Sequence, residues 1–197
     1  MGLTLAQYRT RVLYLLDDVS SVRFTTLQLD AGLQSALVLY DKISPLVRTY
    51  QLEATGWQVL ALPADFAATY INRVQLYSAT SKQAALEVPY KARRVDEQWQ
   101  LETVKSTYSA GQVLTVTYVG KHTVDGLDGA AGSTIENDEL FVMGGAAYAG
   151  YSRAVSRSES INMQPGVQAQ LLALANHYMS MYVAGLRSSS VVTQAFE

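Results

Sequence analysis

Apolar residues recur at helical spacing near both ends of the chain and at two-residue spacing in the middle. No composition break or flexible linker separates these stretches. We therefore expect one α+β domain over 1–187, in which a four-helix bundle packs with a small antiparallel β-sheet inserted between the helix pairs. The expected parts are a helix pair over 1–46, a β region over 47–119, a long loop over 120–134, a helix pair over 135–187, and a tail over 188–197.

Two capping boxes mark the first helix pair. Thr4 with Gln7, and Thr25 with Gln28, place a hydroxyl and an amide where they satisfy free backbone donors. Pro45 stops the second helix, and we expect the two helices to form an antiparallel hairpin. The expected buried faces comprise Leu5, Tyr8, Val12 and Leu15 in the first helix, and Leu29, Leu33, Ala36, Tyr40 and Ile43 in the second.

Alternating patterns predict the strands of the β region. We expect a hairpin of Arg48–Glu53 with Gln58–Leu62, turning at Thr55-Gly56, and then a strand over Tyr70–Tyr77. A second, closing hairpin is expected between Gln98–Thr103 and Gln112–Val119. The basic residues between these segments are expected on an extended loop or small hairpin; they are Lys91, Arg93 and Arg94.

The third helix is rich in small residues. Thr134 or Asn137 is expected to cap it, and it should run to about Ser158. Glycine inside a helix costs roughly 1 kcal/mol relative to alanine, so small residues here predict a close helix approach, from the same chain or a neighbouring copy. The residues assigned to helix or subunit packing are Gly145, Ala149, Gly150, Tyr148 and Tyr151.

The fourth helix is expected from Pro165 to Arg187. Its apolar residues follow alternating spacings of four and three, the coiled-coil period; they are Val167, Leu171, Leu174, Tyr178 and Met181. The tail over 188–197 is mostly polar, and we expect it to be disordered in the isolated chain. Its apolar anchors are Val191, Val192 and Phe196.

Composition narrows the function. The 197 residues are 49% hydrophobic and 16% charged, with a net charge of −2 and no cysteine. The low charge leaves neutral surface that suits contacts with other chains, and no global basic field favours nucleic acid. Without cysteine there are no disulfides, thiolate catalysts or thiolate zinc sites. No apolar run is long enough to span a membrane, and we expect a protein made in a cytoplasm.

The long loop over 120–134 holds the residues closest to a chemical site. A glycine-rich stretch ends it, but the lysine of a phosphate-binding loop is missing. Asp125 and Asp128 alternate with glycines, yet they lack the calcium-loop pattern and are better interpreted as turn formers. A hydrolase using His122 with either aspartate would have no nucleophile beside it. We therefore expect neither an enzyme, nor a metal site, nor a cofactor.

Three signatures together resemble the head–tail connector adaptors of tailed bacteriophages. The first is the N-terminal helix pair, from Leu5 to Asp18 and from Arg23 to Leu37. The second is the segment from Tyr50 to Phe66, ending Leu-Pro-Ala-Asp-Phe, with Ile-Asn-Arg-Val over 71–74. The third is Leu-Thr-Val-Thr-Tyr over 114–118, followed after the loop by Asp-Glu-Leu over 138–140 and an alanine-rich helix.

The resemblance implies a structural protein of the virion neck, assembled in the bacterial host cytoplasm. It would form a homo-oligomeric, typically dodecameric, ring through which packaged DNA passes without specific binding. The helical side and the tail residues Val191, Val192 and Phe196 would dock on the portal protein. The strand side or the long loop would meet the next tail component or a neighbouring subunit; the loop residues are His122, Asp125, Leu127 and Asp128.

A second interpretation remains open on the residues alone. Trp57 and Trp99 could act as stacking platforms in a small-ligand or glycan-binding module with a helical cap. Both tryptophans lie in or near predicted strands, where they also serve structural roles.

Overall fold

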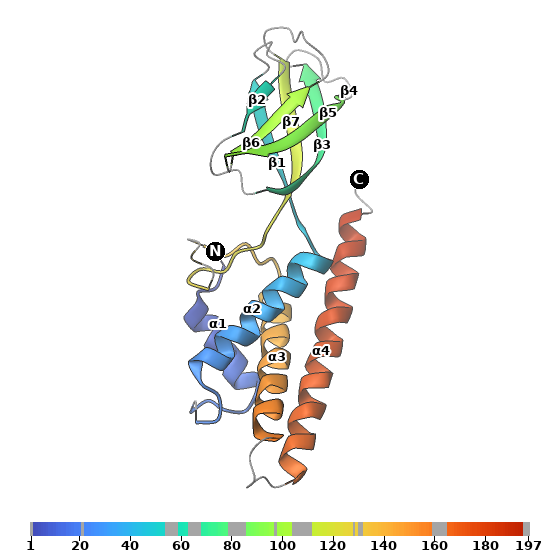
Figure 1. Cartoon of the computed structure of the whole chain (residues 1–197). Coiled ribbons are helices and arrows are strands. Elements are labelled where there is room, and N and C mark those ends of the chain that lie inside the picture. The colour runs from blue at the N-terminus through green and yellow to red at the C-terminus, as the bar shows by residue number, and fades with distance from the viewer. Residues whose placement is uncertain are drawn as a thin grey trace. The chain divides into compact units, whose positions relative to one another are not determined.

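The computed structural model shows an α+β protein whose elements follow the predicted order along the chain (Figure 1). The residues described are 2–20, 22–53, 59–62, 68–78, 86–96, 98–103, 112–127, 129, 132–158 and 165–194. Within them lie four helices, α1 (Leu5–Leu15), α2 (Thr26–Ile43), α3 (Asp138–Ser158) and α4 (Pro165–Gln194). The same residues form seven strands, β1 (Leu46–Glu53), β2 (Val59–Ala61), β3 (Ala68–Ser78), β4 (Leu86–Glu87), β5 (Tyr90–Val95), β6 (Gln98–Thr103) and β7 (Gln112–Gly120).

The chain divides into two compact units. The helical unit combines Met1–Ser44 with His122–Glu197, and the β unit comprises Pro45–Lys121. The β unit is therefore inserted in the sequence between the two helix pairs. Each unit has its own buried apolar cluster, as expected of a compact unit that excludes water from its interior.

Helix ends in the helical unit follow the predicted caps. Thr4 Oγ1 accepts a hydrogen bond from the Gln7 backbone, and the Gln7 side chain accepts one from the Thr4 backbone, at 2.8 Å. Thr25 and Gln28 form the same capping box on α2. Of the two candidates for α3, Asn137 is the cap, because its Oδ1 accepts from the Leu140 backbone at 3.0 Å.

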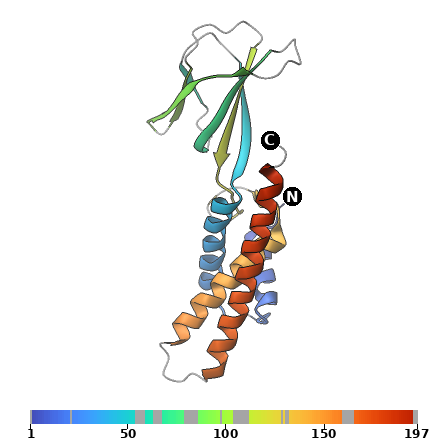
Figure 2. The ribbon, with the colours of Figure 1, turned by 90° about the vertical axis from the view of Figure 1, so that its right-hand side faces the viewer.

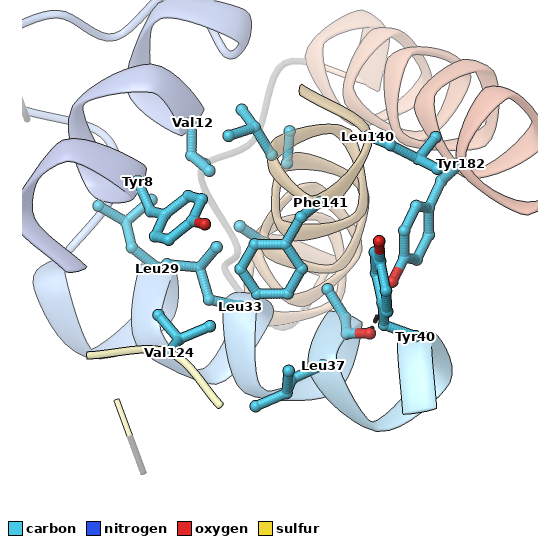
Figure 3. Packing of buried hydrophobic residues seen from close by; sticks show 14 of the residues in the cluster. Tyr8, Val12, Leu29, Leu33, Leu37, Tyr40, Val124, Leu140, Phe141 and Tyr182 are labelled. Atoms are coloured by element: carbon cyan, nitrogen blue, oxygen red, sulfur yellow. Dashed lines mark hydrogen bonds between the residues drawn. The ribbon is translucent and has the colours of Figure 1, made fainter. Parts of the chain in front are cut away.

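Aromatic rings fill the centre of the helical unit (Figure 3). The Tyr8 ring meets Phe141 edge-on at 5.1 Å between centroids, and Tyr40 meets the same phenylalanine at 6.2 Å. Leu33 and Leu37 of α2 complete this layer, and all five side chains are buried. Edge-on pairs stabilise beyond the apolar area they bury.

Contacts with α3 show the relative directions of α1 and α2. Tyr8 and Val12 of α1 lie against Phe141 and the Gly145 region of α3 in that order. Tyr40 of α2 also lies against Phe141, and Gly32, earlier in α2, lies against Gly145. Therefore α1 and α2 run in opposite directions. The Arg9–Asp30 ion pair, 2.7 Å from Nε to Oδ1, links them.

Helices α3 and α4 lie side by side and antiparallel (Figures 1 and 2). Gly144 lies against the Tyr182 ring, and Gly150 lies against Ala175. The buried face of α4 includes Ala175, Tyr182 and Leu186, with Leu171, Leu174 and Tyr178 partly buried beside them. Met181, predicted in the seam, is 41% exposed instead, because the helix keeps the 3.6-residue period and the face drifts from a heptad.

The strands of the β unit form two antiparallel sheets within the described residues, where we expected one. Their orders are β1-β7-β3-β4 and β2-β6-β5. The buried cluster of the unit draws on both sheets; it comprises Leu62, Ile71, Val74, Val88, Leu101, Leu114 and Val116. Residues 91, 93 and 94 lie on β5, which forms a hairpin with β6, one of the two arrangements predicted for them.

Two predicted hairpins are wrong. β1 pairs with β7 along its whole length, and β2 pairs with β6, so β1 and β2 belong to different sheets. β6 and β7 are likewise in different sheets. The physical reason lies in β7, which is buried on both faces at Leu114 and Val116 and at Thr115 and Thr117. Both hydrogen-bonding edges of this strand are taken, by β1 and β3, so none is left for β6.

Candidate functional site

His122 lies buried at the base of the predicted functional loop. Its backbone N–H donates to Asp41 Oδ1 at 2.7 Å. Its ring nitrogens face two backbone carbonyls, with Nε2 at 2.9 Å from Ser44 O and Nδ1 at 3.1 Å from Thr134 O. The ring also meets Tyr40 edge-on at 4.8 Å. The imidazole therefore ties the end of α2 to the segment before α3, and neither nitrogen is oriented toward a substrate.

The rest of the loop, where described, is also anchored to the helical unit. The Asp125 carbonyl accepts a hydrogen bond from the Leu5 backbone at 3.3 Å and so covers a free donor at the start of α1. Leu127 packs against the apolar cluster. Thr123 and Thr134 bond across the loop through backbone and side chain, the closer contact being 2.8 Å. Asp128 lies outside the described residues.

A buried hydrogen bond secures the same region from the side of α1. The Tyr8 hydroxyl donates to the Asp138 carboxylate at the first turn of α3 and lies 3.3 Å from Ser133 Oγ. Burial, and then the bond to Asp138, raises the pKa of Tyr8 well above its usual range. The phenol therefore stays neutral and acts as a structural link between α1 and α3.

The small residues of α3 make their described contacts within the chain. A Cβ on Gly145 would lie 2.7 Å from Leu33 Cδ2, and one on Gly150 would lie 3.1 Å from Ala175 Cβ. Ala149 is fully buried. Tyr148 packs against the apolar cluster, and the Tyr151 hydroxyl donates to Asn176 Oδ1 at 2.7 Å. Of the two alternatives left open by the sequence, close approach by helices of the same chain accounts for these contacts.

Two of the three C-terminal anchors, Val191 and Val192, lie near the end of α4. The helix continues to Gln194, beyond the predicted end at Arg187, so Val191 and Val192 are helical in the structure. Their side chains and all of Phe196 lie outside the described residues. Leu186 is the last buried side chain described in α4, and Arg187 and Ser188 are exposed.

Sequence reasoning missed several exposed apolar side chains and one groove in the helical unit. Tyr14, Val22 and Leu27 are between 64% and 80% exposed, and Val38 and Val155 are also exposed. Between α1 and α3 there is a groove of about 420 Å³, lined by Arg11, Tyr14, Leu15, Glu139, Val142 and Met143. A groove lined mainly by apolar side chains, among them the exposed Tyr14, is a candidate interaction site. The sequence signal was the pair of valines in the short segment between the first two helices.

The alternative sites find less support. Trp99 is partly buried against the apolar cluster of the β unit, whereas Trp57 lies outside the described residues. In the described part of the chain, no three His, Asp or Glu side chains gather as metal ligands would. No helix among the described residues is long and apolar enough to cross a membrane.

No protein-family model matches the sequence, and no curated protein matches it. Among solved structures, the chain is similar to one in "Neck of empty GTA particle computed with C6 symmetry", with a TM-score of 0.33 and 13% identity over 89% of this chain and 88% of that chain. It is also similar to one in "Virion of native gene transfer agent (GTA) particle", with a TM-score of 0.32 and 12% identity over the same shares. TM-scores this low establish neither a shared fold nor a shared function.

Proposed function

We propose that this chain is a structural virion protein that forms a ring between the capsid portal and the tail. In this role it is a head–tail adaptor that lets the genome pass and provides the surface for tail attachment. It acts through its surfaces and catalyses no reaction. The observation that carries the proposal is the apolar groove of the helical unit, together with exposed apolar side chains such as Tyr14, Val22 and Leu27 that do not belong to the buried core.

The order of elements supports the resemblance seen in the sequence. A capped helix pair comes first, the β unit follows, and α3 begins at Asp138 after the long loop. The β strand carrying Leu-Thr-Val-Thr-Tyr over 114–118 is the central strand β7. These are the segments on which the resemblance to adaptor proteins rests.

We assign the end of α4 and the residues after it to portal docking. The helix extends past its last described buried residue, Leu186, so its final turns are not needed to close the described core. Val191, Val192 and Phe196 supply apolar side chains in this segment. Ordering such a segment on a partner costs entropy, which burial of apolar side chains offsets.

We assign the β unit or the long loop predicted over 120–134 to the contact with the next tail component or the neighbouring subunit. Because the base of the loop is fixed by His122 and Thr134, it would present its surface without a large ordering cost. A ring matching a dodecameric portal would surround the DNA. The net charge of −2 suits a channel that should not hold phosphates.

A capture experiment on purified portal rings tests the proposal. Full-length protein should bind the portal, and a variant lacking residues 188–197 should bind at least tenfold more weakly while melting at the same temperature, because Leu186 and the described core remain. Val155→Ser serves as a matched control, since it removes an exposed apolar group elsewhere on the helical unit. Undiminished binding of the truncated protein would contradict the role of the C-terminal segment. Failure of the full-length protein to bind any portal would contradict the adaptor function.

A further inference from the structure

The described residues between α1 and α2 are held by the buried side chain of Asp18. Asp17 adopts a left-handed conformation with φ of 51°, which a non-glycine residue adopts at a cost. Asp18 is buried, and its carboxylate accepts three backbone hydrogen bonds, from Val22 at 3.2 Å, Arg23 at 2.8 Å and Phe24 at 2.9 Å. Bonds to an ionised acceptor are among the stronger ones. The Asp18 side chain therefore holds Val22, Arg23 and Phe24 in place within the chain itself.

The far end of the segment is anchored as well. The Phe24 side chain is 2% exposed, and the Arg153 guanidinium of α3 lies over its ring at 5.9 Å from the centroid. Despite this anchoring, Val19 and Val22 are 59% and 80% exposed. A backbone held by a buried carboxylate thus presents two apolar side chains to solvent. Surfaces that are preorganised in this way bind with a small entropic cost.

The α1/α3 groove combines apolar and charged side chains that complement those of the α1–α2 loop. Tyr14, Leu15, Val142 and Met143 make it apolar, and Arg11 and Glu139 place one charge of each sign beside it. Neither charged side chain forms a hydrogen bond or ion pair within the described residues. The α1–α2 loop carries complementary groups. Its two exposed valines lie between the exposed Asp17 and Arg23, which have opposite charges.

We propose that the α1–α2 loop of one copy, through its described residues 17–20, 22 and 23, docks in the α1/α3 groove of a second copy of this chain. Val19 and Val22 enter the groove, Asp17 faces Arg11, and Arg23 faces Glu139. The two surfaces differ, so the contact is heterologous and closes into a ring when the rotation between copies allows it. This inference rests on the ring of the proposed function and names its subunit contact.

Cysteine cross-linking tests the contact cleanly because the chain has no cysteine. Tyr14→Cys and Val22→Cys each replace an exposed side chain, so both variants should fold like the wild type. A mixture of the two under mild oxidation should give disulfide-linked dimers far in excess of either variant alone. A mixture of Tyr14→Cys with Val155→Cys, which is similarly exposed but outside the loop, is the control. The double variant Tyr14→Cys/Val22→Cys should give a ladder of linked copies, whereas dimers alone would contradict a heterologous contact.

A charge exchange provides an independent readout in the full chain. Glu139→Arg and Arg23→Glu should each weaken self-association about fivefold in sedimentation equilibrium, because each places like charges together at a partly exposed contact. The double variant should recover most of the wild-type affinity. Equal weakening in the double variant and in the singles would contradict the pairing of Arg23 with Glu139.

The outcomes separate this inference from the adaptor function. If the protein forms rings and binds portals but Tyr14→Cys and Val22→Cys do not cross-link above the control, the groove contact is wrong and the adaptor function stands. If Val22→Cys cross-links only to a cysteine of added portal protein, the occupant is a different chain and the inference is overturned. If rings cross-link as expected but do not bind portals, the contact stands and the adaptor function fails.

Discussion

At the scale of single residues, Gly32 determines how closely two helices approach. A Cβ built on this residue of α2 would lie 2.8 Å from the Gly145 carbonyl oxygen and 2.9 Å from the Ala149 backbone nitrogen. Both atoms belong to the backbone of α3, so neither moves aside as a flexible side chain would. The crossing of α2 and α3 therefore depends on a missing methyl group.

We predict that Gly32→Ala destabilises the protein by about 2 to 3 kcal/mol, even though alanine favours a helix, because overpacking against backbone forces the helices apart. Gly166→Ala is the matched control, because a Cβ there meets nothing within 4 Å and the change should be neutral or stabilising by up to about 1 kcal/mol. Urea unfolding followed by circular dichroism measures both. A Gly32→Ala protein as stable as Gly166→Ala would contradict the close crossing.

Tyr182 is the most deeply buried hydroxyl at the α2–α4 contact. Its side chain is fully buried, and its hydroxyl donates to the Ala36 carbonyl of α2 at 2.7 Å. Burial raises the pKa of Tyr182 far above its usual range, and nearby Tyr40, Tyr148 and Asp41 act in the same direction. The Tyr182 phenol is therefore neutral in the folded protein.

The sign of the pH effect follows from the direction of this shift. The pKa of the folded state lies above the value of about 10 for the unfolded chain, so the contribution to stability is complete below about pH 10 and is lost as the pH rises further. Tyr182→Phe should cost about 1 kcal/mol at pH 8, for the lost hydrogen bond. Above pH 10 its stability should fall less steeply than that of the wild type. Tyr14→Phe, on an exposed side chain, should match the wild type; an equal alkaline slope in Tyr182→Phe would contradict the assignment.

At the scale of elements, the helices and their ends were predictable because their signals are local. The boxes at Thr4 and Thr25 and the cap at Asn137 are each decided within four residues of the helix start. Chain segments with a clear 3.6-residue period also gave the buried faces of α1 and α2. Local chemistry therefore accounts for the helical elements and for the α+β class.

Strand pairing could not be predicted, because it depends on contacts distant in sequence. The turn signal at residues 55 and 56 predicts a change of chain direction, but it does not identify which strands pair with each other. The informative feature was the β-branched run over Val113–Val119, which is typical of a strand buried on both faces. In the structure β1 and β3 take both edges of this strand, which excludes the β6–β7 hairpin, and β2 pairs with β6 rather than with β1.

The candidate site was only partly predictable, because its contacts also join residues that are distant in sequence. Small residues of α3 signalled close helix packing, but their partners, Gly32 and Leu33 of α2 and Ala175 of α4, emerge only in three dimensions. His122 offered no sequence signal for its two carbonyl contacts. The exposed valines beside Asp18 were visible in the sequence, but the buried carboxylate that fixes them was not.

At the scale of the whole molecule, the chain enters and leaves the β unit at neighbouring points. Leu46, near the start of β1, is paired with Gly120, at the end of β7, and paired residues of antiparallel strands lie about 5 Å apart. His122 then bonds to Ser44 and Asp41 on the helical side. Each unit is thus closed by contacts of its own.

We predict that the helical unit folds without the insertion. Replacing residues 45–121 by a short Gly/Ser linker should leave a helical protein with one cooperative unfolding transition, because the linker spans a gap set by an adjacent strand pair and the entropic cost of closing a short loop is small. Circular dichroism and thermal unfolding measure the result. Removing only residues 59–103 is the control: it takes away β3 and the second sheet, leaves one side of β7 unpaired, and should give an aggregating protein. Cooperative folding of this control together with failure of the complete excision would show that the helical unit needs the β unit to fold.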